Sequence, residues 1–175
     1  DDIDGEGSPF DLASKRTTTF GSFAMTLAES SPSRDITDPK KIPQGNEAPP
    51  CGGILALYNR GDRRRWHWPC PDCGSYFEGL WEHLTWDKLE SNMDAAMTVR
   101  MICPHCQYSI APEQRYAMLQ KGVWLKEGQT IDDDGIVIGR GLTSNIASFW
   151  LRGVAAGLTT WAKLVKSYLD AEDDF

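Results

Sequence analysis

Two cysteine pairs constrain the fold of this chain more than any other feature. They are Cys70-Pro71-Asp72-Cys73-Gly74 and Cys103-Pro104-His105-Cys106-Gln107, separated by residues 74–102. A CxxC turn presents two thiolates to one metal ion, and structural zinc takes four tetrahedral ligands of this kind. The proline stiffens the first turn, and the glycine that ends it allows the sharp bend that follows. The spacing therefore predicts one four-cysteine zinc site, with Cys70, Cys73, Cys103 and Cys106 as the ligands.

Each cysteine pair lies where a strand is expected to turn back. Residues 65–69 would run into 76–80, and residues 97–102 into 108–110, which is the pattern of a zinc ribbon. Four thiolates leave no open coordination position, so the metal is expected to be structural rather than catalytic. So small a ribbon has little core of its own, and the metal should supply much of its folding energy.

Other uses of these residues compete with zinc binding. Redox CxxC motifs come singly beside a βαβ pattern, and two disulfides need an oxidising compartment that nothing here signals. A rubredoxin-like iron site uses the same cysteine turns, so iron remains an alternative to zinc. Four thiolates saturate a metal, so His67 and His105 are expected not to be ligands. His83, beside Trp81 and Trp86 in the sequence, is expected to be a packing residue rather than a chemical one. Cys51 lies in a Pro/Gly-rich turn and is interpreted as a bystander.

The segments around the cysteines predict an α+β chain. A helix is expected at 12–19, and the apolar run at 23–28 is expected to be a buried strand that ends in the polar loop 29–32, as in parallel α/β sheets. Further expectations are a helix at 112–120, strands at 123–125 and 135–138 with a turn at 132–135, an apolar run at 146–154, and an amphipathic helix at 160–171. Residues 32–53 hold five of the ten prolines and are expected to be a linker.

Charge limits the possible partners. The net charge is -7, which argues against binding nucleic acid over the whole surface. A local patch remains possible where Arg60, Arg63, Arg64 and Arg65 adjoin Trp66, His67 and Trp68. Two interpretations carry equal weight: a solvated strand edge that balances the zinc-thiolate charge, and a phosphate-contacting patch with aromatic support. No apolar run is long enough for a membrane span.

Three segments resemble one protein family. Tyr58-Asn59-Arg60-Gly61-Asp62-Arg63-Arg64-Arg65, the first cysteine turn, and Leu80-Trp81-Glu82-His83-Leu84-Thr85-Trp86 resemble the central segment of GpA-type large terminase subunits of lambda-like phages and prophages. The opening Asp1-Asp2-Ile3-Asp4-Gly5-Glu6-Gly7-Ser8-Pro9 with Glu29-Ser30-Ser31-Pro32 resembles the end of the packaging ATPase. Ser148-Phe149-Trp150 to Trp161-Ala162-Lys163-Leu164 resembles the region ahead of the nuclease.

The resemblance implies a DNA-packaging function. Such proteins move viral double-stranded DNA into a prohead with ATP and Mg²⁺, cut concatemeric genomes, and work with a small terminase subunit and a portal in the cytoplasm of the bacterial host. Ser30 and Ser31 would lie in the motif that couples ATP hydrolysis to movement. The implied organisation is the remnant of an α/β P-loop ATPase at 1–31, a linker at 32–53, a zinc ribbon at 54–111, and an α+β segment at 112–175 that leads toward the nuclease.

Important catalytic parts are missing from the 175 residues. There is no GxxxxGK[ST] loop, no hydrophobic strand ending in an Asp-Glu pair, and no acidic cluster suited to a two-metal nuclease. The chain has no start methionine or signal peptide, and it is expected to be a piece of a longer protein. We therefore expect no catalytic residues and neither ATP hydrolysis nor DNA cutting by this piece alone. The competing functions are a free-standing zinc-ribbon adaptor for nucleic acid or protein and rubredoxin-like electron transfer.

Overall fold

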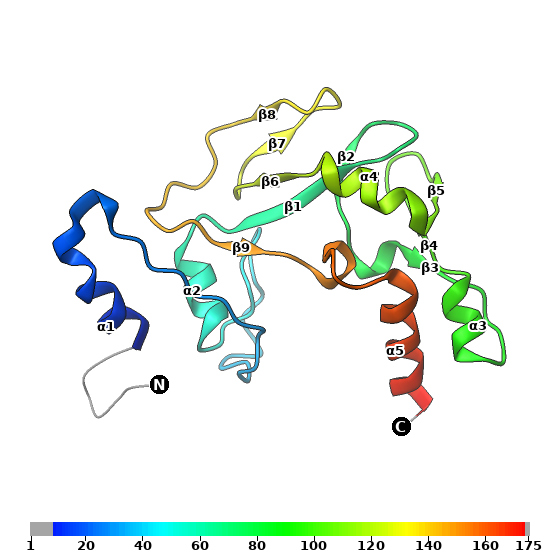
Figure 1. Cartoon of the computed structure of the whole chain (residues 1–175), viewed down its shortest axis with the longest axis horizontal. Coiled ribbons are helices and arrows are strands. Elements are labelled where there is room, and N and C mark those ends of the chain that lie inside the picture. Colours follow the sequence, from blue (N-terminus) through cyan, green and yellow to red (C-terminus); the bar gives the residue numbers. More distant parts are fainter. Residues whose placement is uncertain (1–8, 174–175) are drawn as a thin grey trace.

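A computed structural model describes residues 9–173 of the chain. Figure 1 shows helix α1 (Pro9–Arg16) at one end, a strand-rich middle, and helices α3 (Asn92–Met97) and α5 (Trp161–Asp173) at the other end. The mixture of short strands and helices confirms the α+β class. The first residues of the family resemblance, 1–8, lie outside the described part of the chain.

Two β-hairpins carry the cysteine pairs. Strand β1 (Arg64–Pro69) pairs antiparallel with β2 (Tyr76–Glu78), and β4 (Arg100–Ile102) pairs antiparallel with β5 (Ser109–Ile110). A third strand, β3 (Leu84–Thr85), lies on the other side of β4. The prediction that the chain turns back at each cysteine pair is confirmed.

Strand β1 is the central strand of the larger sheet, and the other three strands pair with it. Strand β6 (Val123–Leu125) lies antiparallel along one side of it, and Trp66 faces Trp124 across that pair. On the other side, β2 pairs with the end of β1, and the parallel strand β9 (Phe149–Trp150) pairs with its beginning. Strands β7 (Thr130–Ile131) and β8 (Val137–Ile138) form a separate hairpin. The strand expected at 123–125 is confirmed, and the one expected at 135–138 is shortened to β8.

The predicted helices after the second cysteine pair are present. The 3-10 turn η3 (Pro112–Gln114) continues into α4 (Arg115–Gln120), which together cover the expected 112–120. Helix α5 begins after Thr160, whose side-chain oxygen accepts the backbone N–H of Lys163 at 3.1 Å. That hydrogen bond satisfies one of the free N–H groups in the first helical turn.

Several short helical elements had not been predicted. They are the helices α2 (Ile54–Arg60) and α3 and the 3-10 turns η2 (Trp81–His83) and η4 (Gly153–Ala155). Each spans two turns or fewer, too short for an apolar period to be recognised. Helix α3 packs against α5, and its buried side chains are only Ala95 and Ala96.

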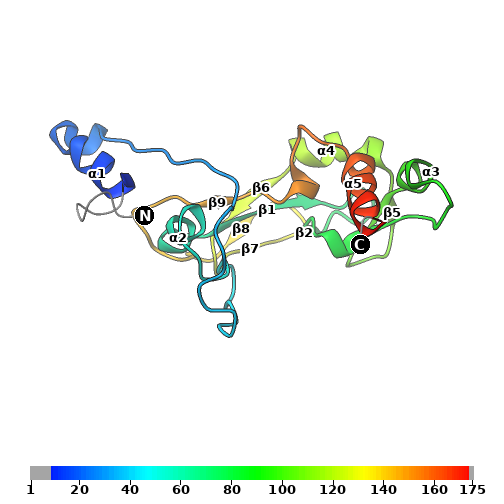
Figure 2. The ribbon, with the colours of Figure 1, turned by 90° about the horizontal axis from the view of Figure 1, so that it is seen from below.

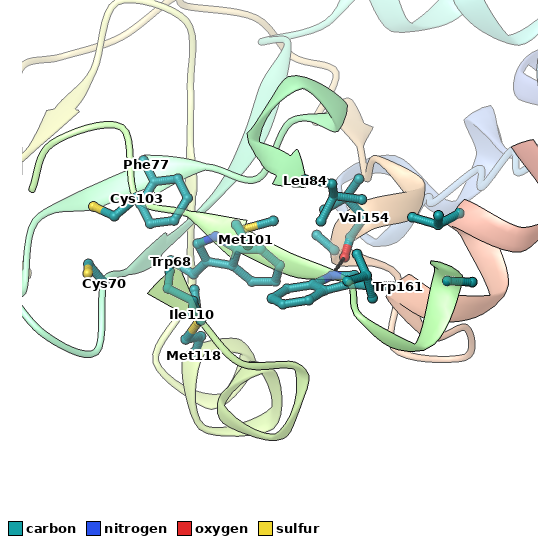
Figure 3. Packing of buried hydrophobic residues seen from close by; sticks show 14 residues of the cluster. Trp68, Cys70, Phe77, Leu84, Met101, Cys103, Ile110, Met118, Val154 and Trp161 are labelled. Atoms are coloured by element: carbon teal, nitrogen blue, oxygen red, sulfur yellow. Dashed lines mark hydrogen bonds between the residues drawn. The ribbon is translucent and has the colours of Figure 1, made fainter. Parts of the chain in front are cut away.

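One apolar core joins the hairpins to the C-terminal helix. Trp68 from β1 lies between the cysteine side of the core, where Phe77, Cys70 and Cys103 gather, and Trp161 from α5 (Figure 3). Met101, Ile110 and Met118 complete the layer between them, and the indole N–H of Trp161 donates to the Val154 carbonyl at 3.0 Å. The core therefore contains residues from both sides of position 111, the expected domain boundary, and that boundary stays a prediction.

The N-terminal segment has a different character, and one prediction about it is wrong. Helix α1 and the 3-10 turn η1 (Thr18–Phe23) replace the expected helix at 12–19, and neither has a buried residue. Residues 24–30 are extended but unpaired, with Met25 83% and Leu27 82% exposed, so the buried strand expected at 23–28 is absent. Figures 1 and 2 both show helix α1 standing apart from the strands. A strand needs a neighbour to accept its hydrogen bonds, and none of the described strands reaches it.

Candidate metal centre

The two hairpins bring the four predicted cysteine sulfurs together. All four lie within 4.8 Å of one another. Across the hairpins, the Sγ atoms of Cys70 and Cys106 are 3.8 Å apart, and those of Cys73 and Cys103 are 3.9 Å apart. Zn–S bonds of about 2.3 Å in tetrahedral geometry place the sulfurs about 3.8 Å apart, so the arrangement fits a metal ion at its centre.

The two cysteine turns have the same backbone geometry. In the first, the N–H of Gly74 donates to the Cys70 carbonyl at 3.0 Å, and in the second the N–H of Gln107 donates to the Cys103 carbonyl at 3.0 Å. The residue after the second cysteine has a positive φ in both turns, 80° at Gly74 and 62° at Gln107. Glycine adopts this conformation without strain, whereas glutamine must hold it at a cost. The second turn therefore adopts the same shape as the first, although glutamine stands where the first turn has glycine.

Crowding makes the protonation of these thiols unequal. The backbone N–H of Ser75 lowers the pKa of Cys73 to about 7. At Cys106 the backbone of Tyr108 acts in the same direction, but desolvation and the three neighbouring thiols outweigh it and raise the pKa to about 12. Four thiolates so close together need a cation to balance them. This donor set suits a soft divalent metal ion.

The centre has a buried side and an exposed side. Cys70 and Cys103 are buried in the core beside Phe77, while Cys73 and Cys106 are exposed. None of the three histidines is part of the sulfur cluster. The ring of His105 lies 3.2 Å from the Tyr76 carbonyl, and the ring of His83 packs edge-on against Phe77 at 5.6 Å.

The fifth cysteine lies elsewhere. Cys51 is buried, forms a β-bridge with Ile36, and donates its thiol to the Gly52 carbonyl at 3.4 Å. It is therefore part of the packing of residues 36–52 and not of the sulfur cluster.

The four candidate arginines are not gathered into one free basic surface. Arg63 lies 2.9 Å from Glu47 and 2.7 Å from Glu127, and Arg64 lies 2.7 Å from Asp62. The guanidinium of Arg65 is buried, stacks over Trp150 at 4.2 Å, and donates to the Asn46 carbonyl at 3.1 Å. Arg60, with a side chain 51% exposed, pairs with Asp11 at 3.3 Å.

The two candidate coupling serines lie on the extended N-terminal segment. Both are exposed, and the hydroxyl of Ser30 donates to the Ser31 carbonyl at 2.9 Å. Ser30 also lines a mainly apolar groove of about 350 Å³ between this segment, α2 and residues 146–149, where Leu27, Leu57 and Phe149 contribute. The coupling assignment stays a prediction.

A buried polar network was missed by the sequence analysis. The hydroxyl of Ser148 donates to the Tyr58 carbonyl at 2.9 Å and accepts the N–H of Arg63 at 2.9 Å, and the N–H of Ser148 donates to the Asp62 carboxylate at 3.0 Å. Burial alone would raise the pKa of Asp62, but the hydrogen bonds from Arg64 and from the Ser148 backbone lower it overall. The network joins two of the segments that carry the family resemblance, residues 58–65 and 148–150. A lone serine gave no signal of this role.

A second missed residue is Arg115. Its buried guanidinium donates to three backbone carbonyls of the η4 region: Val154 at 3.3 Å, Thr159 at 2.6 Å, and Ala156. Burial lowers the pKa of Arg115. Its position at the start of a helix, after Pro112, resembles that of an ordinary exposed helix residue, so no sequence pattern predicted the contact.

These features define an α+β chain with paired cysteine turns that fit a tetrahedral metal ion. The sequence profile of the family "Phage terminase large subunit gpA, ATPase domain" matches residues 1–124, and the chain belongs to this family. The resemblance found in the sequence is thereby confirmed. Membership implies DNA and the packaging machinery as partners in general. No curated protein and no solved structure is significantly similar to the chain. Between residues 9 and 173, each helix is too short or too polar to cross a membrane.

Proposed function

We propose that this chain is the part of a phage DNA-packaging terminase large subunit that a structural zinc ion holds together. The observation that carries the proposal is the sulfur geometry, in which separations of 3.8 and 3.9 Å across the hairpins fit a zinc tetrathiolate. Cys70, Cys73, Cys103 and Cys106 would hold the ion. It would cross-link the β1–β2 hairpin to the β4–β5 hairpin.

The proposed ion is structural because of where its ligands lie. Cys70 and Cys103 are both buried in the same core as Trp68 and Trp161, so the metal and the core stabilise each other. All four candidate ligands are cysteines, and a fully ligated ion has no position for a substrate. When bound, the ion supplies charge balance and cross-linking, and the chain's own residues supply the rest of the fold.

The test is metal content combined with unfolding. Purified chain should hold one zinc ion, and Cys103→Ser should lose the metal and the cooperative thermal transition. The matched control is Cys51→Ser, because Cys51 is also buried but lies outside the sulfur cluster. A coloured sample with iron-thiolate absorption would instead favour the electron-transfer alternative. Equal metal content in Cys103→Ser and the wild type would refute the site.

For the N-terminal part, we propose that residues 1–31 are the end of the packaging ATPase, with Ser30 and Ser31 in its coupling motif. ATP and Mg²⁺ would then act only in the full-length protein, and residues 112–175 would lead toward its nuclease. The exposed hydroxyl side chains of the two serines, beside a groove shared with α2, support this placement. ATP turnover by the 175-residue chain that Ser31→Ala abolishes would contradict the proposed inactivity.

The proposed partners are viral double-stranded DNA, the small terminase subunit and the portal, in the cytoplasm of the bacterial host. Among the four candidate DNA-contacting arginines, only Arg60 has a side chain that is about half exposed. All four arginines interact with carboxylates, but the side chains of Arg63, Arg64 and Arg65 are at most 25% exposed, whereas the Arg60–Asp11 pair lies at the surface. The DNA-contact proposal for this group therefore narrows to Arg60, and Arg60→Ala should weaken binding if that contact exists.

A further inference from the structure

The outer edge of the β7–β8 hairpin carries three consecutive exposed apolar side chains. Ile136, Val137 and Ile138 are 60%, 39% and 53% exposed. Within residues 9–173, β8 pairs only with β7, and Figure 1 shows β8 on the side of the hairpin away from β6 and β1. Exposed edge strands are usually protected by a proline or by charged side chains, and residues 136–138 have neither. This edge is therefore open to a further strand.

Hydrogen bonds at both ends of β8 hold the hairpin in shape. At the turn, the N–H of Asp132 donates to the Ile136 carbonyl at 3.2 Å, and the Asp132 carboxylate accepts the N–H of Ile136 at 2.8 Å. At the other end, the side-chain amide of Gln129 donates to the Gly139 carbonyl at 3.2 Å. A strand held in this way has little conformational entropy left to lose when it pairs with another.

The pairing within the hairpin decides which backbone groups face the open edge. In an antiparallel ladder, hydrogen-bonded and non-hydrogen-bonded residue pairs alternate. Ile136 bonds inward to the turn, so Ile138 also bonds inward to β7, and Val137 between them directs its N–H and C=O outward. Gly135 and Gly139 have positive φ, 82° and 92°, so regular strand geometry covers only residues 136–138. A further strand would bond to the backbone of Val137.

The two ends of this edge carry opposite charges that nothing nearby neutralises. Asp133 and Asp134 lie in the turn before β8, Arg140 follows the strand, and all three are exposed. None of the three takes part in an ion pair between residues 9 and 173. Lys126 and Glu127, which precede β7, are each paired with a charged residue before β1 or at its start. One end of the edge is thus acidic and the other basic.

This arrangement makes the edge complementary to itself. If two β8 edges pair antiparallel around Val137, Ile136 of one copy lies opposite Ile138 of the second copy. The same pairing brings Arg140 opposite Asp134 of the second copy, and the symmetry repeats each contact. Apolar pairs and opposite charges across strands stabilise a sheet, whereas a parallel pairing would place like charges together. A second copy of the chain therefore satisfies the backbone, the apolar side chains and the charges at once.

We propose that the open edge of β8 is a self-association surface, on which two copies of the chain pair antiparallel about a twofold axis at Val137. Such an interface uses the same patch on both copies. Strands of this length bury far less than the about 1,200 Å² of the smallest stable interfaces, so the dimer is weak and forms where copies are concentrated.

The experiment measures sedimentation of zinc-loaded chain from about 10 µM to about 1 mM, the range in which a weak dimer forms. The wild type should sediment faster as its concentration rises. Arg140→Glu and Asp134→Arg should each weaken the association about tenfold, because each places like charges opposite one another twice in the symmetric dimer. A mixture of these two variants should associate as the wild type does, since the mixed dimer has opposite charges at both ends.

Two further variants separate the edge from general charge effects. Lys163→Glu is the matched control, because Lys163 is an exposed residue of α5 and its replacement changes the net charge as much as Arg140→Glu does. It should leave the association unchanged. Val137→Pro removes the outward N–H and should abolish the dimer. Thermal unfolding checks that each variant is folded, and if Val137→Pro is not, the charge variants at exposed positions decide the matter.

Several outcomes would overturn the proposal. If the wild type stays monomeric at the highest concentration, the edge is not a self-association surface and belongs to another partner. If Lys163→Glu weakens the dimer as much as Arg140→Glu, the effect is general repulsion and the contact is wrong. If mixing Arg140→Glu with Asp134→Arg restores nothing, the antiparallel arrangement is refuted. Metal content measured on the same samples judges the zinc proposal separately, so either proposal can fail while the other stands.

Discussion

The cysteine region and the N-terminal segment both contain large apolar side chains in extended backbone, and these side chains behave in opposite ways. Strand β1 (Arg64–Pro69) contains Trp68, which is fully buried. The run that includes Phe23, Met25 and Leu27 is extended too, but Phe23 is 92% exposed. The difference lies in the neighbours: β1 has strands on both sides, and residues 24–30 have none among the described strands.

The contrast shows what an apolar run requires. A strand gains stability only when its backbone N–H and C=O groups find partners and its side chains lose contact with water. The cysteine region meets both conditions, through the hairpins at each cysteine turn and through α5, which closes the core with Trp161 and Val165. Residues 24–30 meet neither condition within the described part of the chain.

The largest effect should come from Trp161→Ala. Trp161 is 1% exposed and fills the space between Trp68 and α5. Removing a large buried aromatic side chain typically costs about 3–5 kcal/mol, and this one also leaves the Val154 carbonyl without its indole donor. Chemical denaturation should show the loss as a lower midpoint. A change below about 1 kcal/mol would mean that α5 is not part of the ribbon core.

A smaller but still large effect is expected for Arg115→Met. Methionine keeps much of the side-chain volume but removes the guanidinium donor from the Thr159 carbonyl and one of two donors from the carbonyls of Val154 and Ala156. A hydrogen bond from a charged group contributes about 1.5–3 kcal/mol and a neutral one about 1 kcal/mol, so a total near 3 kcal/mol is expected after the partial compensation. Hydrogen exchange should increase at residues 155–161 and not in the β4–β5 hairpin. Uniform exchange throughout the chain would contradict the local role.

An intermediate effect, dependent on pH, is expected at Asp62. Its pKa in the folded chain lies below the ordinary value of 3.8, so its contribution is complete above that value and is lost as the pH falls through the lower folded pKa. Asp62→Asn should remove about 2 kcal/mol at neutral pH, the typical value of hydrogen bonds to a charged group. The difference from the wild type should shrink below about pH 4. If the stability difference between Asp62→Asn and the wild type grew as the pH fell, the pKa of Asp62 would be raised by folding and not lowered.

The smallest effect should come from the N-terminal segment. Phe23→Ser and Leu27→Ser replace side chains that are 92% and 82% exposed, and surface substitutions of this kind usually change stability by less than about 0.5 kcal/mol. Both should leave the thermal midpoint unchanged and improve solubility. A loss as large as that of Trp161→Ala would show that the segment is covered within the chain, and the contrast between the N-terminal segment and the cysteine region would disappear.

The sequence predicted the parts of the fold whose signals are local or strictly spaced. The hairpins at both cysteine turns, β6 and the amphipathic α5 follow from spacing, turn residues and apolar period. Short helices such as α3 were missed because one or two turns carry no recognisable period. The strand expected at residues 23–28 was wrong because a run of apolar residues shows only that burial is favourable, not that a partner is present.

The sequence by itself determined the family, the pairing of the cysteines into two turns, and the excess of negative charge. Only the tertiary structure decided how charges and polar groups are used. The arginines at 60–65 look like one basic patch in the sequence, yet carboxylates as distant in the chain as Glu127 neutralise them. Arg115 and Ser148 gave no signal, yet they hold together segments far apart in the chain. Ion pairs and hydrogen bonds depend on distances of about 3 Å, and such distances between remote residues are set only when the chain has folded.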